Sequence, residues 1–171
     1  MGNYEFTIAL RIRHPNIAPA EITRNLGIEP MHAWRAGDPR RDVAGGEISG
    51  TYRESYWMAR LMAKPELAAD RVSVESEVLR TLAQLRRAFG FLVTLKAEGG
   101  AADLHVNIFA REEFNLEFLP ETLSLLGRLG LTVAIEVKPH PHDLGAMAPP
   151  TDSFNVAFSL LRIVSSMPSR T

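Results

Sequence analysis

Alternating apolar and polar positions predict several strands of a sheet with one buried face. The clearest case is residues 4–13, where an apolar side chain stands at every second position. A period of two places such side chains on one face of a strand. The same alternation predicts strands over 104–108 and 131–137. Aromatic residues favour another strand over 52–61 and a short one over 32–35, which would place Trp34 and Trp57 in one sheet.

Apolar residues spaced three to four apart predict three helices. We expect them over residues 19–26, 73–89 and 120–129. Ser73 is suited to cap the start of the second helix, because its hydroxyl can accept a backbone N–H from the first turn. Gly27 and Gly130 follow the first and third helices, where glycine readily takes the left-handed conformation that ends a helix.

The segment after the long helix is interpreted as a strand. Gly90 is expected to end the helix, and Phe91, Val93 and Leu95 then alternate up to the Gly99–Gly100 pair. This interpretation gives the order β-α-β-β-α-β followed by β-α-β. We therefore predict an α+β fold, a ferredoxin-like βαββαβ unit extended by a further βαβ, with one sheet and helices mainly on one face.

Proline and glycine interrupt the remaining segments. Residues 28–51 predict a long surface loop. We expect residues 1–138 to form one α+β domain, and residues 139–171 to be a Pro- and His-rich linker with an apolar C-terminal segment packed on it. Within that segment, residues 154–164 fit helical and strand periods equally well. A capping residue at Asp152 favours the helix.

Composition narrows the class of protein. With 171 residues, 46% of them hydrophobic and 23% charged, the chain suits one packed domain. A net charge of -1 provides no field to hold a polyanion, so we expect no nucleic-acid partner. The absence of cysteine excludes thiol chemistry and fits the cytoplasm. The N-terminal residues do not resemble a signal peptide and the apolar runs are short, so we expect no membrane association.

Polar and aromatic residues gather around the predicted loop. The candidate ligand-binding residues are His32, Trp34, Arg35, Asp38, Arg40 and Trp57. Arginine offers paired donors to a carboxylate or a phosphate, so an anionic small molecule or peptide is one interpretation. The alternative is structural: Gly37 and Asp38 form a turn, Trp34 packs in the core, and the arginines are solvated.

Metal binding and catalysis are not predicted. His140 and His142 lie close to Asp143, but their spacing fits no zinc signature, and we expect no metal. His105 and Asn107 are expected simply to face outward from their strand. The sequence has no glycine loop for phosphate, no dinucleotide fingerprint and no Gly-x-Ser-x-Gly elbow, so we expect no cofactor and favour a noncatalytic role.

An outward apolar pair predicts an interaction face. In the strand interpretation, Leu92 and Phe109 lie on neighbouring strands, opposite the face buried by Val93 and Ile108. Exposed apolar surface of this kind usually needs cover. The C-terminal segment, a second copy of the chain in a homodimer, or another protein partner would supply it.

Three motifs together resemble a known family. They are the helix ending in Leu26-Gly27-Ile28-x-Pro30, the Trp34-x-x-Gly37-Asp38 turn, and the later Tyr56-Trp57 pair. Over residues 4–138 the chain resembles the bacterial family catalogued as domain of unknown function 4279. The resemblance implies an architecture and a suggested link to toxin–immunity systems, but no catalytic residue.

Two functional hypotheses follow. The first is a noncatalytic binding or protein-interaction module of immunity type. The second is a small enzyme or sensor that binds an anionic small molecule near Trp34 and Arg35.

Overall fold

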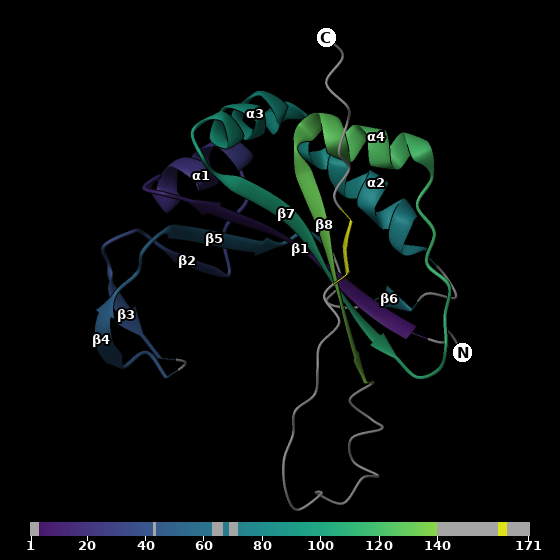
Figure 1. Ribbon diagram of the computed structural model, residues 1–171, viewed down its shortest axis with the longest axis horizontal. Helices are drawn as coiled ribbons and strands as arrows, with labels where there is room; N and C mark the ends of the chain where they lie inside the picture. Colours follow the sequence, from purple (N-terminus) through teal and green to yellow (C-terminus); the bar gives the residue numbers. More distant parts are fainter. Residues whose placement is uncertain (1–3, 43, 63–66, 69–71, 140–160, 164–171) are drawn as a thin grey trace, which may run out of the picture.

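The computed structural model describes residues 4–42, 44–62, 67–68, 72–139 and 161–163, and shows a mixed α+β fold (Figure 1). The strands are β1 (Tyr4–His14), β2 (His32–Trp34), β3 (Pro39–Arg41), β4 (Glu47–Thr51), β5 (Ser55–Arg60), β6 (Leu67–Ala68), β7 (Ala101–Ala110), β8 (Leu131–Pro139) and β9 (Leu161–Ile163). The helices are α1 (Pro19–Leu26), α2 (Val74–Gln84), the 3₁₀ turn η1 (Leu85–Ala88), α3 (Phe89–Ala97) and α4 (Pro120–Leu129). None of the described helices is long and apolar enough to cross a membrane.

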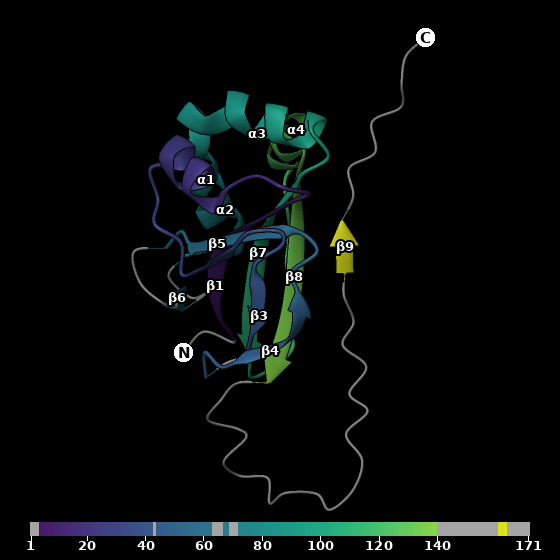
Figure 2. The same cartoon turned by 90° about the vertical axis from the view of Figure 1, so that its left-hand side faces the viewer.

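One sheet carries the strands in the order β2-β5-β1-β7-β8-β9, with β9 at the edge beyond β8 (Figure 2), and β6 also pairs with β1. Neighbouring strands are antiparallel except β7 and β8, which are parallel and are joined through α4. The helices gather on one side of the sheet, whereas the β3–β4 hairpin extends on the other side at the β2 end (Figure 1). We call the side of the sheet away from the helices the open face.

Strand alternation explains the core. On β1, the side chains of Phe6, Ile8, Leu10 and Ile12 have no exposed surface, and they point toward the helices.

Ser73 caps α2 by accepting the backbone N–H of Ser76 at 3.1 Å. Gly27 and Gly130 end α1 and α4 in the left-handed conformation, with φ of 66° and 64°. The expected α+β class, the three long strands and the three helical starts are therefore confirmed.

The predicted strand after Gly90 is wrong, because this segment forms helix α3. Leu85, Ala88, Leu92 and Leu95 recur at helical spacing, and all four are buried. The helical path therefore continues through the 3₁₀ turn and Gly90 rather than ending there. The alternation of Phe91, Val93 and Leu95 was the weaker of two overlapping patterns.

This correction changes the strand order. Without a strand before it, β7 cannot form the expected local hairpin, and pairs instead with β1 on one side and β8 on the other. The elements from β1 to β7 still follow the order β-α-β-β-α-β when β1, β2, β5 and β7 are taken as the strands of the main sheet. The extension beyond β7 is α4 and β8.

Two further expectations are corrected. The short strand predicted over 32–35 is confirmed as β2, but the rest of residues 28–51 is not all loop, because it contains the β3–β4 hairpin. Asp42 closes the turn of this hairpin by accepting the N–H groups of Ala44 and Gly46 at 2.9 and 2.8 Å. Residues 161–163 form strand β9 rather than helix. The rest of the predicted C-terminal helix, together with His140 and His142, lies outside the described residues.

Candidate anion-binding site on the open face

Polar side chains cover the middle of the open face. They alternate with the buried residues of the same strands, so that each strand sends every second side chain away from the helices. Strand register sets their neighbours: Arg11 of β1 lies opposite Asp103 of β7, which lies beside Thr132 of β8. Tyr56 of β5 lies opposite Arg13 of β1. Charged groups from distant parts of the chain thus meet on one surface.

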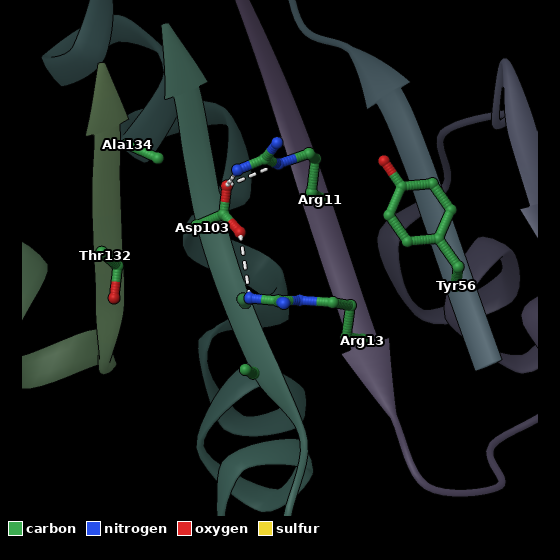
Figure 3. A pocket seen from close by; sticks show the side chains of 8 residues that line it. Arg11, Arg13, Tyr56, Asp103, Thr132 and Ala134 are labelled. Atoms are coloured by element: carbon green, nitrogen blue, oxygen red, sulfur yellow. Dashed lines mark hydrogen bonds and ion pairs between the residues drawn. The ribbon is translucent and has the colours of Figure 1, made fainter. Parts of the chain in front are cut away.

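These groups surround a pocket of about 420 Å³ (Figure 3). Its lining residues are Arg11, Arg13, Tyr56, Ala101, Ala102, Asp103, Thr132 and Ala134. Small side chains on β7 and β8 leave the hollow, and the long side chains from β1 reach across β7 to border it. The pocket therefore combines an open floor with charged groups at its border.

Asp103 organises the charges. Its side chain is only 8% exposed, and its Oδ1 accepts from Nε of Arg11 at 2.8 Å and lies 2.7 Å from Nη2 of the same arginine. Arg13 is more exposed, at 42%, and its Nη2 lies 4.0 Å from Oδ2 of Asp103. Since the lining includes two guanidinium groups and one carboxylate, it retains an excess of one positive charge.

Tyr56 contributes a neutral hydroxyl. Burial raises the pKa of this phenol above its usual value, Asp103 raises it further, and the nearby Arg11 and Arg13 oppose the shift. The hydroxyl therefore stays protonated at neutral pH and can donate a hydrogen bond to an anion.

A second polar cluster adjoins the pocket along β7 and β8. Nε2 of His105 lies 3.3 Å from Oε2 of Glu136, and Nζ of Lys138 lies 3.3 Å from the same oxygen. Nζ of Lys138 also donates to Oδ1 of Asn107 at 3.4 Å. His105 and Asn107 do face away from the core, as expected, but both are half-buried within this network.

The protonation of His105 gives a testable pH dependence. Burial is the largest cause lowering its pKa, followed by Arg11, and Lys138 adds to the effect, while Glu136 and Asp103 oppose it. The folded state therefore binds a proton at His105 less readily than the unfolded state, whose histidine has a pKa of about 6.5. Stability from this residue is fully present above that pH and is lost as the pH falls below it, through the lower pKa of the folded state.

We expect His105→Gln to flatten the acid side of the stability profile, because glutamine does not titrate. Urea unfolding between about pH 5 and 8 would measure this. His32→Gln, at an exposed histidine, is the matched control and should leave the profile as it is in the wild type. An equally steep loss in His105→Gln and the wild type would contradict the lowered pKa.

Half of the residues predicted from the sequence line a different hollow, between β2 and the β3–β4 hairpin. This groove, of about 890 Å³, is lined by His32, Trp34 and Asp38, among others. Arg35 and Arg40 are exposed and are not part of its lining. The structure thus brings three of the six residues to one hollow.

Trp57 lies away from both hollows. It is fully buried on the core side of β5, where its indole N–H donates to Oγ1 of Thr23 at 3.0 Å. It pairs in register with Ala33, next to Trp34, so the two tryptophans share the sheet as expected but point to opposite faces. A fully buried ring cannot contact a ligand on the open face.

Trp34 stands in an aromatic stack on the open face. Its ring lies 4.4 Å from that of Tyr52 and 4.4 Å from that of Tyr56, with interplanar angles of 17° and 18°. The indole of Trp34 is therefore stacked against two tyrosine rings, which gives it a packing role on this face. The expectation that Trp34 packs in the core is also wrong, since the ring is only half-buried.

Asp38 has the structural role that was the alternative to ligand binding. Its Oδ2 accepts the backbone N–H of Arg35 at 2.8 Å, and its own N–H donates to the carbonyl of Arg35 at 3.1 Å. Gly37 sits in this turn with a φ of 89°. The Trp-x-x-Gly-Asp motif is therefore a turn that joins β2 to the hairpin.

The expected interaction face of Leu92 and Phe109 does not form. Leu92 belongs to α3 and is 1% exposed, so it lies in the core on the helix side of the sheet. Phe109 is half-buried and belongs to β7, where it lies between Glu5 of β1 and Lys138 of β8 on the open face. Only a strand over residues 91–97 would place these two side chains side by side.

Sequence reasoning missed the central residues of the pocket. Arg11 and Arg13 are outward positions of the strand predicted over 4–13, and Asp103 directly precedes the strand predicted over 104–108. A signal did exist for the two arginines, because each alternates with apolar residues in the same strand. Which strand would lie beside which could not be seen, since the pairing of β1 with β7 joins residues 92 positions apart.

The family comparison agrees with the resemblance found in the sequence. The family described as Domain of unknown function (DUF4279) matches residues 4–140, and the chain belongs to this family. No curated protein and no solved structure matches the chain. In the parts of the chain that the structure describes, no group of three or more His, Cys, Asp or Glu side chains is placed to hold a metal ion.

Proposed function

We propose that the protein is a noncatalytic binding module whose open-face pocket takes an anionic group. The observation that supports this most directly is the arrangement of two arginines around one nearly buried carboxylate. Asp103 holds Arg11 in place, while Arg13 lies beyond hydrogen-bond distance from that carboxylate and keeps donors for a ligand. Guanidinium donors and a neutral tyrosine hydroxyl are groups that recognise carboxylates and phosphates.

The chemistry of the pocket supports binding rather than catalysis. Its titratable lining consists of two arginines, a tyrosine with a raised pKa, and Asp103. The carboxylate of Asp103 already accepts from Arg11, which makes it a poor general base. Thr132 is the remaining hydroxyl in the lining, and no base among the pocket residues is available to activate it.

The proposal relocates one earlier hypothesis and retains the other. The anion site that the sequence placed near Trp34 and Arg35 is proposed instead in the pocket beyond Tyr56, which is the neighbour of Trp34 on the adjacent strand. A protein partner of immunity type, or a second copy of the chain, remains the second candidate, because a carboxylate on a partner has the same chemistry as a free acid. We also propose a ferredoxin-like description of the β1–β7 unit, on the basis of its strand order, and a cytoplasmic location, on the basis of its lack of cysteine.

Arg13→Gln is the variant that tests this function. In the wild type, acetate should raise the melting temperature more than chloride does at equal ionic strength, because a ligand that binds only the folded state stabilises it. Arg13→Gln should lose most of this difference, since a hydrogen bond to a charged group contributes roughly 1.5–3 kcal/mol. Scanning fluorimetry of the purified chain measures both.

Arg24→Gln is the matched control, because Arg24 is an exposed arginine on α1, on the helix side of the sheet. This variant should respond to acetate as the wild type does. An acetate response that is equal in all three proteins would show that the effect is a general salt effect and would contradict the proposed site.

A further inference from the structure

We infer that Asp103 makes the pocket selective for a carboxylate monoanion over a dianion such as a phosphate monoester. This inference rests on the proposed function, and names the class of ligand for the same pocket. In this role Asp103 is a specificity-determining residue that need not contact the ligand.

The number of charges in the pocket decides which anions it matches. Arg11 and Asp103 form a close pair, with contacts of 2.7 and 2.8 Å to one oxygen, and the carboxylate is nearly buried. The positive charge of Arg11 is therefore largely neutralised where it stands. Arg13 is left as the cation that faces the pocket, at 4.0 Å from the second oxygen of Asp103. One cation matches one negative charge.

A second negative charge on the ligand would meet repulsion. Asp103 lines the same pocket, and its Oδ2 lies 4.0 Å from Nη2 of Arg13, so a dianion close to Arg13 is also close to this carboxylate. Two basic groups farther along β7 and β8 are already engaged: Lys138 is paired with Glu136, and burial lowers the pKa of His105. Neither group is therefore a spare cation to balance the second charge.

The remaining donors also fit a carboxylate. Tyr56 is held protonated by burial, and Thr132 borders the opposite side of the pocket in Figure 3. The other lining residues, Ala101, Ala102 and Ala134, offer space but no side-chain donor. A planar carboxylate can accept hydrogen bonds from the Arg13 guanidinium, while the rest of the ligand lies over these alanine side chains.

The test compares acetate with sulfate in NMR titrations of the wild type and of Asp103→Asn. Asparagine has the shape of aspartate and still accepts from Arg11, but it removes the negative charge. In the wild type, acetate should bind about 10-fold more tightly than sulfate. In Asp103→Asn the order should reverse, because the pocket then has two positive charges. Asp38→Asn, which removes a carboxylate from the other groove, should keep the order of the wild type.

A second measurement needs no variant and so does not depend on the folding of Asp103→Asn. Inorganic phosphate changes from a monoanion to a dianion between about pH 5 and 8.5, and its affinity for the wild type should fall over this range more than that of acetate. Acetate controls for the titration of His105, which would affect both anions. Equal pH dependence of the two would overturn the inference.

The outcomes separate the inference from the function it rests on. Sulfate binding as tightly as acetate in the wild type, or an unchanged order in Asp103→Asn, would overturn the inference and leave the anion site standing. Saturable binding of neither anion would overturn the proposed function itself. Two peptides, one ending in a free carboxylate and one amidated, then show where the bound carboxylate comes from. Binding of the free peptide but not of the amidated one supports a protein C-terminus as the ligand. Binding of acetate but of neither peptide supports a small acid.

Discussion

Replacement of Leu92 by alanine is expected to lower the free energy of unfolding by about 2 to 5 kcal/mol, the range for large-to-small changes in a core. Leu92 is 1% exposed in α3, and it continues the buried helical row that begins at Leu85. Val93, the next residue, is 52% exposed. Val93→Ala should therefore change stability by less than about 0.5 kcal/mol, as surface substitutions usually do.

The pair of variants decides between helix and strand. The strand interpretation of residues 91–97 buries Val93 and exposes Leu92, so it requires the opposite ranking. Urea unfolding of both variants, analysed with a shared slope, gives the two differences directly. A larger loss in Val93→Ala than in Leu92→Ala would contradict the helical assignment of α3 and would restore the apolar pair of Leu92 and Phe109 on the open face.

Gly100→Ala is expected to destabilise the fold by about 1 to 3 kcal/mol, because the core has no room for a methyl group there. A Cβ at this position would lie 2.5 Å from Cδ2 of Leu95, 2.7 Å from Cδ2 of His14 and 2.7 Å from the backbone oxygen of Leu95. The last of these contacts involves backbone, and the N–H of Gly100 donates to that same oxygen at 2.8 Å. Relief would require the end of α3 to move away from β1.

Gly90→Ala is the matched control, and it should act in the opposite direction. No atom lies within 4 Å of a Cβ built at Gly90, and the residue is inside α3. Alanine in a compatible helical position stabilises by roughly 0.4 to 1 kcal/mol, chiefly by restricting the unfolded chain. Thermal or urea unfolding measures both variants. Destabilisation by Gly90→Ala, with Gly100→Ala tolerated, would show that Gly90 is the helix terminator that the sequence suggested.

Local patterns predicted the fold wherever one period dominated. The alternation in β1 and the capping of α2 by Ser73 are properties of neighbouring residues, and both are confirmed. The strand predicted over residues 91–97 is wrong because a strand period and a helix period overlap there. The glycine at position 90 also favours the end of the preceding helix. Its conformation is an ordinary helical one, so nothing local distinguished a tolerated glycine from a terminating one.

The candidate site was harder to predict from the sequence than the fold, for a physical reason. The polar residues between His32 and Arg40 are close to one another in the sequence. In the structure, however, Asp38 from this group stabilises a turn. The pocket instead depends on strand register, which places Arg11 against Asp103. Register is decided by the packing of the whole sheet, so charged residues at outward positions can be identified from the sequence while their partners cannot.

The most direct test of the anion-binding pocket is the backbone amide NMR spectrum of the wild-type protein during an acetate titration, with chloride keeping the ionic strength constant. The proposed site predicts saturable shifts concentrated at Arg11, Arg13, Tyr56 and Asp103, with amides on the exposed side of α1 unchanged. Shifts that do not saturate, or saturable shifts that cluster around His32 and Asp38 in the groove beside the hairpin, would contradict it.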